Sequence, residues 1–353
     1  MKRFITILVT IFFIVGTCNG CGSSDTSEPT QTESSPEESK KLSVISTIFA
    51  PFDFTRAVAG ENADVSILVP PGSESHSFEP TPQDIIKIQE CDVFIYVGGE
   101  SDAWVNEVLE SMDTSKMKVI TLMDCVEVVK ENIVEGMEDD GHDHADEEEH
   151  ADEEEHADEE EHTDEEEHAD EEEHAEEEVY DEHVWTSPRN AKLIAQKISD
   201  TLCEIDAANI ETYKQNTTDY LAELDELDSK FQAVVDSSAR KTIVFGDRFP
   251  FRYFADAYGL TYFAAFPGCS TDTEPSAATV KFLIDKVSEE QIPVVFHIEF
   301  GNVNMATTIS EPTGAKVHLF HACHNITKDD LDAGKTYIDL MTTNVDVLKE
   351  ALQ

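Results

Sequence analysis

Short apolar runs alternate with amphipathic stretches over most of this chain, and the alternation predicts strands and helices in turn. Runs rich in Val, Ile and Phe predict buried strands at 42–48, 65–69, 93–97, 118–122, 242–245, 261–266, 294–298 and 316–320. Helical spacing predicts helices at 82–90, 103–111, 188–202, 207–235 and 329–352, with others between the later strands. This order of elements is typical of an α/β protein.

The stretch 207–235 divides this pattern into two halves. Its apolar side chains recur at steps of three and four residues, with one longer gap, and indicate a single long amphipathic helix. We therefore expect two α/β lobes separated by that helix. The first lobe is expected at 42–188, a helical segment at 189–240 and the second lobe at 241–353. Ligands of such folds bind at the carboxyl ends of the strands.

The first 20 residues resemble the signal peptide of a bacterial lipoprotein. A basic start precedes an apolar run at 4–15 that is too short to span a bilayer. We expect Cys21 to carry the lipid, because Gly20 precedes it and Gly22-Ser23-Ser24 follow it. Cys18 is the alternative, and both positions lack the usual Leu three residues upstream. Residues 21–41 then form a flexible tether, and the protein is anchored to the outer face of the bacterial cell membrane. Secretion without a lipid remains open.

The charge balance is strongly acidic, with 76 Asp and Glu against 24 Lys and Arg and a formal net charge of −52. Such an excess argues against nucleic acid or anionic lipid as an electrostatic partner. After the signal region no apolar run is long enough to span a membrane. Apart from the two N-terminal cysteines five remain, which permits at most two disulfides, and no spacing predicts a Cys-based zinc ribbon.

About half of the negative charge comes from one tract, residues 138–178, which contains 27 carboxylates and no Lys or Arg. Within it Ala-Asp-Glu-Glu-Glu-His repeats with a period of six. Its imidazoles belong to His142, His144, His150, His156, His162, His168 and His174. The tract cannot bury a core, so we expect a disordered insertion in the first lobe that chelates divalent cations weakly at several equivalent places. The alternative is a solvated acidic spacer.

Four segments carry a family resemblance. Residues 70–82 read Pro-Pro-Gly-Ser-Glu-Ser-His-Ser-Phe-Glu-Pro-Thr-Pro, and residues 181–188 read Asp-Glu-His-Val-Trp-Thr-Ser-Pro. Together with 254–260 and 344–352 they resemble signatures of the zinc/manganese ABC-transporter solute-binding proteins. The acidic His-rich insertion just before the second segment is similar to that of the zinc-uptake subgroup.

The resemblance implies two similar α/β lobes joined by one rigid helix, with a metal site in the cleft between them. It further implies a monomeric extracytoplasmic receptor that captures Zn²⁺ and passes it to a membrane permease, which works with a cytoplasmic ATPase. A ligand set with more imidazole than carboxylate favours zinc over manganese.

The resemblance implies His76 and His183 as metal ligands. The usual third ligand, a His after the first strand of the second lobe, is missing at 245–254. Asp247 is the nearest candidate, but it could equally be a helix N-cap or pair with Arg248 or Arg252.

The usual fourth ligand, an Asp after the last strand, is also missing, and we expect His324 to replace it. His321 is the alternative ligand, although its imidazole could instead make a structural hydrogen bond. Glu299, at a strand end, could orient a ligand imidazole. Cys269 and Cys323 both fall in loops of the second lobe and could form a disulfide, or Cys323 could be a thiolate ligand.

Other functional classes are less consistent with the sequence. A zinc enzyme is disfavoured because the chain has no His-Glu-x-x-His motif and no evident general base for a metal-bound water. A manganese receptor of the same family, a metal-binding surface adhesin and an extracellular metal buffer remain alternatives.

Overall fold

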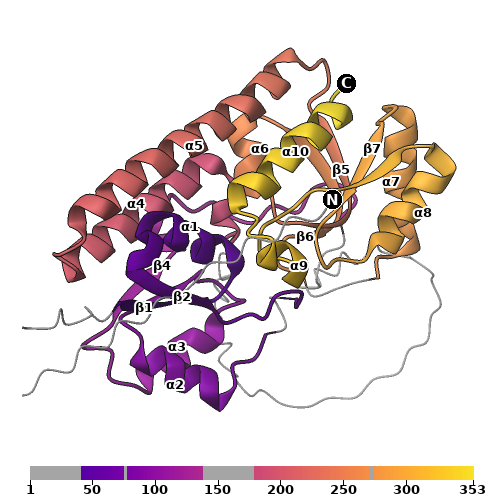
Figure 1. The fold of residues 1–353 in the computed structure, drawn as a ribbon. Coiled ribbons are helices and arrows are strands. Elements are labelled where there is room, and N and C mark those ends of the chain that lie inside the picture. The colour runs from indigo at the N-terminus through magenta and orange to yellow at the C-terminus, as the bar shows by residue number, and fades with distance from the viewer. Residues whose placement is uncertain (1–40, 75–77, 138–178, 271–273) are drawn as a thin grey trace, which may run out of the picture. The chain divides into compact units, whose positions relative to one another are not determined.

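The computed structural model describes residues 41–74, 78–137, 179–270 and 274–353. The expected signal peptide, most of the tether, the acidic tract and His76 lie outside the described residues. Two four-stranded sheets form the two lobes, and every strand pair in them is parallel (Figure 1).

The two sheets have the same strand order. The first is β2-β1-β3-β4, built from β1 (Leu42–Ser46), β2 (Ala63–Ile67), β3 (Val93–Tyr96) and β4 (Lys118–Thr121). The second is β6-β5-β7-β8, built from β5 (Thr242–Phe249), β6 (Thr261–Pro267), β7 (Val294–His297) and β8 (Lys316–Leu319). This repetition confirms the prediction of two similar α/β lobes. It also brings the strand ends of each lobe to one edge, where the loops gather.

Helices cover both sheets and connect them. The first lobe contains α1 (Phe49–Ala59), α2 (Pro82–Glu90) and α3 (Ala103–Glu110). The two lobes are linked through α4 (Pro188–Ile205) and α5 (Ile210–Ser237). The second contains α6 (Arg252–Tyr258), α7 (Ala277–Glu289), α8 (Val303–Thr313), α9 (Lys328–Asp332) and α10 (Tyr337–Ala351). No helix among the described residues is both long and apolar enough to cross a membrane.

The 28-residue helix α5 is the long helix expected at 207–235. Tyr213, Leu224 and Phe231 of its apolar stripe are fully buried, as the three- and four-residue spacing predicts. Helices α1, α4 and α10 all pack against it (Figure 1). Because α1 belongs to the first lobe and α10 to the second, α5 joins the two lobes by packing as well as by connection.

One apolar core runs through both lobes. It includes Val44 and Ile95 of the first sheet, Phe245 and Phe296 of the second, and Leu224 of α5. Two smaller clusters lie under α2 and α3 and under α7 and α8, on the other faces of the sheets. Residues 41–353 accordingly form one compact unit.

Two helices differ from the sequence-based expectation. The stretch 329–352 is not one helix, because Gly334 adopts φ +75° and Thr336 begins α10 with a capping box that includes Asp339. The helix α1 was not expected at all. Nine of its 11 residues are buried, so it lacks the polar face from which helical periodicity is recognised.

A buried carboxylate links α1 to α10. Asp53 accepts a hydrogen bond from the Tyr337 backbone N–H at 2.7 Å, at the N-terminus of α10. Burial raises the pKa of Asp53 to about 6, although the Tyr337 N–H and the Arg56 guanidinium both favour the charged form. The folded protein thus holds a proton at Asp53 over a pH range in which the unfolded chain has lost it.

We expect Asp53 to make the fold less stable as the pH rises from about 4 to 7. Relative to Asp53→Asn, the wild-type free energy of unfolding should fall by up to about 3 kcal/mol, because the folded-state pKa lies above the unfolded value. Urea unfolding at a series of pH values measures this difference. Asp64→Asn, which changes an exposed carboxylate, is the control. Parallel pH profiles for wild type and Asp53→Asn would contradict the expectation.

Candidate metal site

His183 lies fully buried in the segment that precedes α4. Asp181 Oδ1 accepts hydrogen bonds from the His183 backbone N–H at 2.8 Å and from the ring Nδ1 at 3.0 Å. A carboxylate at Nδ1 fixes the tautomer that carries the proton there, so Nε2 presents its lone pair. Burial lowers the pKa of His183, but the Asp181 and Glu182 carboxylates outweigh it and the pKa is raised.

His324 lies beside His183 although the two come from different lobes. Their rings meet edge to face with centroids 4.8 Å apart, and the His324 ring also lies 4.8 Å from the Trp185 ring. Trp185 fastens this contact, because its Nε1–H donates to the Ala322 carbonyl at 2.8 Å. The two imidazoles expected from the second and fourth ligand positions are therefore brought together.

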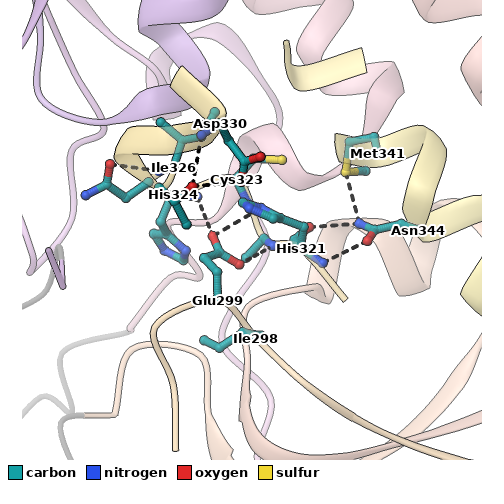
Figure 2. A network of polar contacts seen from close by, with 12 residues as sticks. Ile298, Glu299, His321, Cys323, His324, Ile326, Asp330, Met341 and Asn344 are labelled. Carbon is teal, nitrogen blue, oxygen red and sulfur yellow. Dashed lines mark hydrogen bonds and ion pairs between the residues drawn. The ribbon is translucent and has the colours of Figure 1, made fainter. Parts of the chain in front are cut away.

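The loop that carries His324 is held by two side chains (Figure 2). Glu299, just after β7, accepts from the Ala322 N–H at 2.6 Å and from the His324 N–H at 3.0 Å. Asn344 of α10 accepts from the His321 N–H and donates to the His321 carbonyl, both at 2.8 Å. Glu299 thus holds the backbone of the loop, and its carboxylate comes closest to the imidazole of His321, at 3.5 Å.

His321, the alternative ligand, takes part in the loop itself. Its Nδ1 accepts a hydrogen bond from the Cys323 N–H at 3.0 Å. That bond occupies the Nδ1 lone pair, so the geometry favours a structural hydrogen bond for His321, the alternative left open from the sequence.

Asp247 lies within β5, which extends to Phe249, so the helix N-cap alternative for it is wrong. Helix α6 begins later, with Phe251 at its N-cap. The buried Asp247 carboxylate accepts from the Arg248 N–H at 2.9 Å and from the Ile298 N–H at 3.2 Å. Burial raises its pKa, against the effect of these two bonds.

The two arginines considered as partners of Asp247 bind other carboxylates. Arg248 Nη2 lies 2.8 Å from Glu74 Oε2, and Arg252 Nε lies 3.2 Å from Asp256 Oδ2. Asp247 therefore forms an ion pair with neither Arg248 nor Arg252.

The expected disulfide between Cys269 and Cys323 is not formed, and both are free cysteines. Their surroundings explain the correction. Cys323 is fully buried, and the carboxylates that raise the pKa of its thiol are those of Glu299 and Asp53. The carboxylate that raises the pKa of Cys269 most is Glu182, so the two thiols have different surroundings. Burial raises the pKa of the Cys323 thiol well above its ordinary value, and the group of possible metal ligands found among the described residues contains Cys269 and not Cys323.

Cys269 instead joins a group with metal-ligand chemistry. Ligand atoms of Glu182, His183 and Cys269 all lie within 4.8 Å of one another. This group was not expected from the sequence. A signal was present in residues 181–188, because the carboxylate of Glu182 directly precedes the imidazole of His183.

The segment that leads to His76 contacts the His324 loop. Asn325 Nδ2 donates to the Pro70 carbonyl at 2.7 Å and to the Ser73 carbonyl at 2.8 Å, and the Gly72 N–H donates to the Ile326 carbonyl at 2.9 Å. His76 lies outside the described residues, so the expectation for it stays a prediction.

Known proteins with the same fold and related sequences are numerous. The ZnuA protein of Bacillus subtilis, named a high-affinity zinc uptake system protein, is 29% identical over 344 residues, which cover 96% of each chain. The zinc-binding lipoprotein AdcA of Streptococcus pneumoniae strain R6 is 29% identical over 88% of this chain. The match spans only 56% of AdcA, so this chain corresponds to about half of that relative.

Two crystal structures are similar over 89% of this chain at 26% identity. They are the Zn(II)-bound ZnuA-like domain of Streptococcus pneumoniae AdcA, with a TM-score of 0.67, and the metal-dependent lipoprotein YcdH of Bacillus subtilis, with a TM-score of 0.68. The matches cover 99% and 100% of those chains. The model of the family described as zinc-uptake complex component A, periplasmic, matches residues 44–351. The fold, the repeated sheets and this match over most of the chain agree with the resemblance found in the sequence, and the chain belongs to this family of zinc-uptake complex components.

Proposed function

We propose that this protein captures Zn²⁺ in the cleft between its lobes and is not an enzyme. The observation that carries the proposal is the meeting of the His183 and His324 rings, 4.8 Å apart, from opposite lobes. Asp181 supports it by orienting the His183 ring so that Nε2 presents a lone pair. His76 and Asp247 are the further ligands we propose from the sequence, with His321 as a less favoured alternative.

The ligand chemistry favours zinc. Imidazole nitrogens suit Zn²⁺, whereas Mn²⁺ prefers oxygen ligands. The relatives support the same choice, because two of them are named for zinc uptake or zinc binding. A manganese receptor would need more carboxylate around the paired imidazoles.

The captured ion is passed to an ABC-transporter permease, which is driven by a cytoplasmic ATPase. The family description, a component of a zinc-uptake complex, supports this partnership. The relatives named lipoproteins support an extracytoplasmic protein anchored through Cys21, or through Cys18. Competition against a chelator of known zinc affinity tests the central claim. We expect one tight site per chain, and a protein without such a site would overturn the proposal.

The acidic tract at 138–178 collects or buffers zinc in this scheme. Its deletion is expected to lower the number of weakly bound zinc ions and to leave the tightest site unchanged, because the paired imidazoles lie outside it. Competition titrations of the full chain and of the deletion variant measure both quantities.

The matched control replaces the seven tract histidines by Gln, which keeps the length and the acidic charge. Weak binding that survives in this control would show that carboxylates and not imidazoles hold those ions, and an unchanged number of weakly bound ions after deletion would favour the solvated acidic spacer. Loss of the tight site in a folded deletion variant would contradict the proposed division between tract and cleft.

A further inference from the structure

We propose that Cys269 is a metal ligand of this cleft, binding zinc as a thiolate together with His183 and Glu182. The inference rests on the proposed function and names part of its ligand set. Its basis is the group of nitrogen, oxygen and sulfur atoms from these three residues, which all lie within 4.8 Å of one another. A tetrahedral zinc ion binds nitrogen, carboxylate oxygen and sulfur at about 2.0–2.3 Å, which puts two ligand atoms of one ion about 3.3–3.8 Å apart. The three side chains therefore need to move only slightly closer together to bind one ion.

The course of the backbone after β6 places the Cys269 side chain beside His183. Cys269 follows β6 by two residues, at the carboxyl end of the strand, and Gly268 lies between them. A Cβ added to Gly268 would lie 2.9 Å from Cε1 and 3.0 Å from Nδ1 of His183. The main chain can therefore pass the imidazole closely only with glycine at this position, and the next side chain enters the cleft beside His183.

Two hydrogen bonds position the thiol. The Cys269 backbone N–H donates to Glu131 Oε1 at 3.3 Å, which holds the turn. The backbone N–H of Glu182 donates toward the Cys269 sulfur. Burial and the carboxylates of Glu182, Asp181 and Glu131 outweigh this donor and raise the pKa of the Cys269 thiol well above its ordinary value, but a metal ion bound to the sulfur displaces the proton.

The surrounding charge favours a divalent cation. Asp181 and Glu182 are 1% and 2% exposed, and their carboxylates, together with that of Glu131, raise the pKa of Cys269 by repelling a negative charge on its sulfur. Negative groups at this depth are costly without compensation, and a metal ion supplies it. Because thiolate is a soft ligand, Cys269 also strengthens the preference for zinc over manganese.

Cobalt substitution provides the direct test. When Co²⁺ is bound to the full chain, we expect a thiolate-to-cobalt charge-transfer band in the near ultraviolet. The band should persist in Cys203→Ser, which changes another partly buried cysteine, and disappear in Cys269→Ser. The acidic tract contains no cysteine, so cobalt bound there cannot produce the band. We also expect Cys269→Ser to lower zinc affinity at least about tenfold.

A second measurement uses only the wild-type protein and does not depend on how the variant folds. Zinc should slow the alkylation of Cys269 by iodoacetamide and leave that of Cys203 unchanged, as measured by peptide mass mapping. Equal alkylation rates with and without zinc, or a charge-transfer band that survives in Cys269→Ser, would overturn the inference. In either case tight zinc binding by the wild type would leave the proposed function intact, whereas its absence would remove the proposed function itself.

Discussion

His183→Ala is expected to weaken zinc binding by at least about 100-fold, because changing an outer partner of a metal ligand alone costs about 10–100-fold. The substitution removes one of the two imidazoles that meet across the cleft and leaves the buried Asp181 carboxylate without the ring it orients. Chelator competition measures the affinity. Circular dichroism and urea unfolding of the metal-free variant show whether the fold persists.

Two further variants make the His183 experiment specific. His318→Ala removes an imidazole that is partly exposed in β8 and lies 3.1 Å from Glu350, and zinc affinity should not change. Asp181→Asn keeps the side-chain volume but loses the charge at Nδ1, and its affinity should fall by about 10–100-fold. A folded His183→Ala protein with wild-type affinity would show that the metal site lies elsewhere.

Much of the fold could be predicted from the sequence because the central strands of its sheets are buried on both faces. Parallel strands between helices read as continuous apolar runs, and β3 and β7 are short examples. The long helix α5 was predictable for a different reason, since one of its faces remains in solvent. The helix α1 was missed because burial on almost all sides removes that contrast.

The candidate site could be predicted only in part. His183 and His324 follow from their places in family signatures and past a strand end, and the structure places them together. The group of Cys269 with Glu182 depends on a close approach of Gly268 to an imidazole that is distant in sequence, and no local pattern specifies such an approach. The erroneous disulfide has the same origin, because two loop cysteines in one lobe need not face each other.

The cleft also depends on the core beneath the His324 loop. Phe320 immediately precedes that loop, is fully buried and lies against four other phenylalanine rings. Centroid separations are 5.9, 4.9, 5.5 and 5.0 Å to Phe245, Phe251, Phe254 and Phe296, respectively. Its backbone N–H donates to the His297 carbonyl at 2.9 Å and continues the pairing of β7 with β8. The loop therefore starts from a buried cluster of five phenylalanine rings.

Phe320→Ala is expected to lower the free energy of unfolding of the metal-free protein by about 3–5 kcal/mol, because it removes a buried ring and leaves a cavity among the other four. The neighbouring Leu319 is 39% exposed, and Leu319→Ala should cost no more than about 1 kcal/mol. Urea unfolding measures both. A cost for Phe320→Ala that is no larger than that of the Leu319 control would contradict the packing argument.

The stabilisation by zinc then distinguishes damage to the core from damage to the metal site. A ligand that binds only the folded state at about 100 times its dissociation constant adds about 2.7 kcal/mol to the free energy of unfolding. Both proteins are measured at one zinc concentration, about 100 times the dissociation constant of the wild type. If Phe320→Ala damages only the core, zinc should stabilise the variant by the same amount as the wild type. A smaller gain at the same zinc concentration would mean that the His324 loop has moved, and that the phenylalanine cluster positions the metal ligand as well as stabilising the lobe.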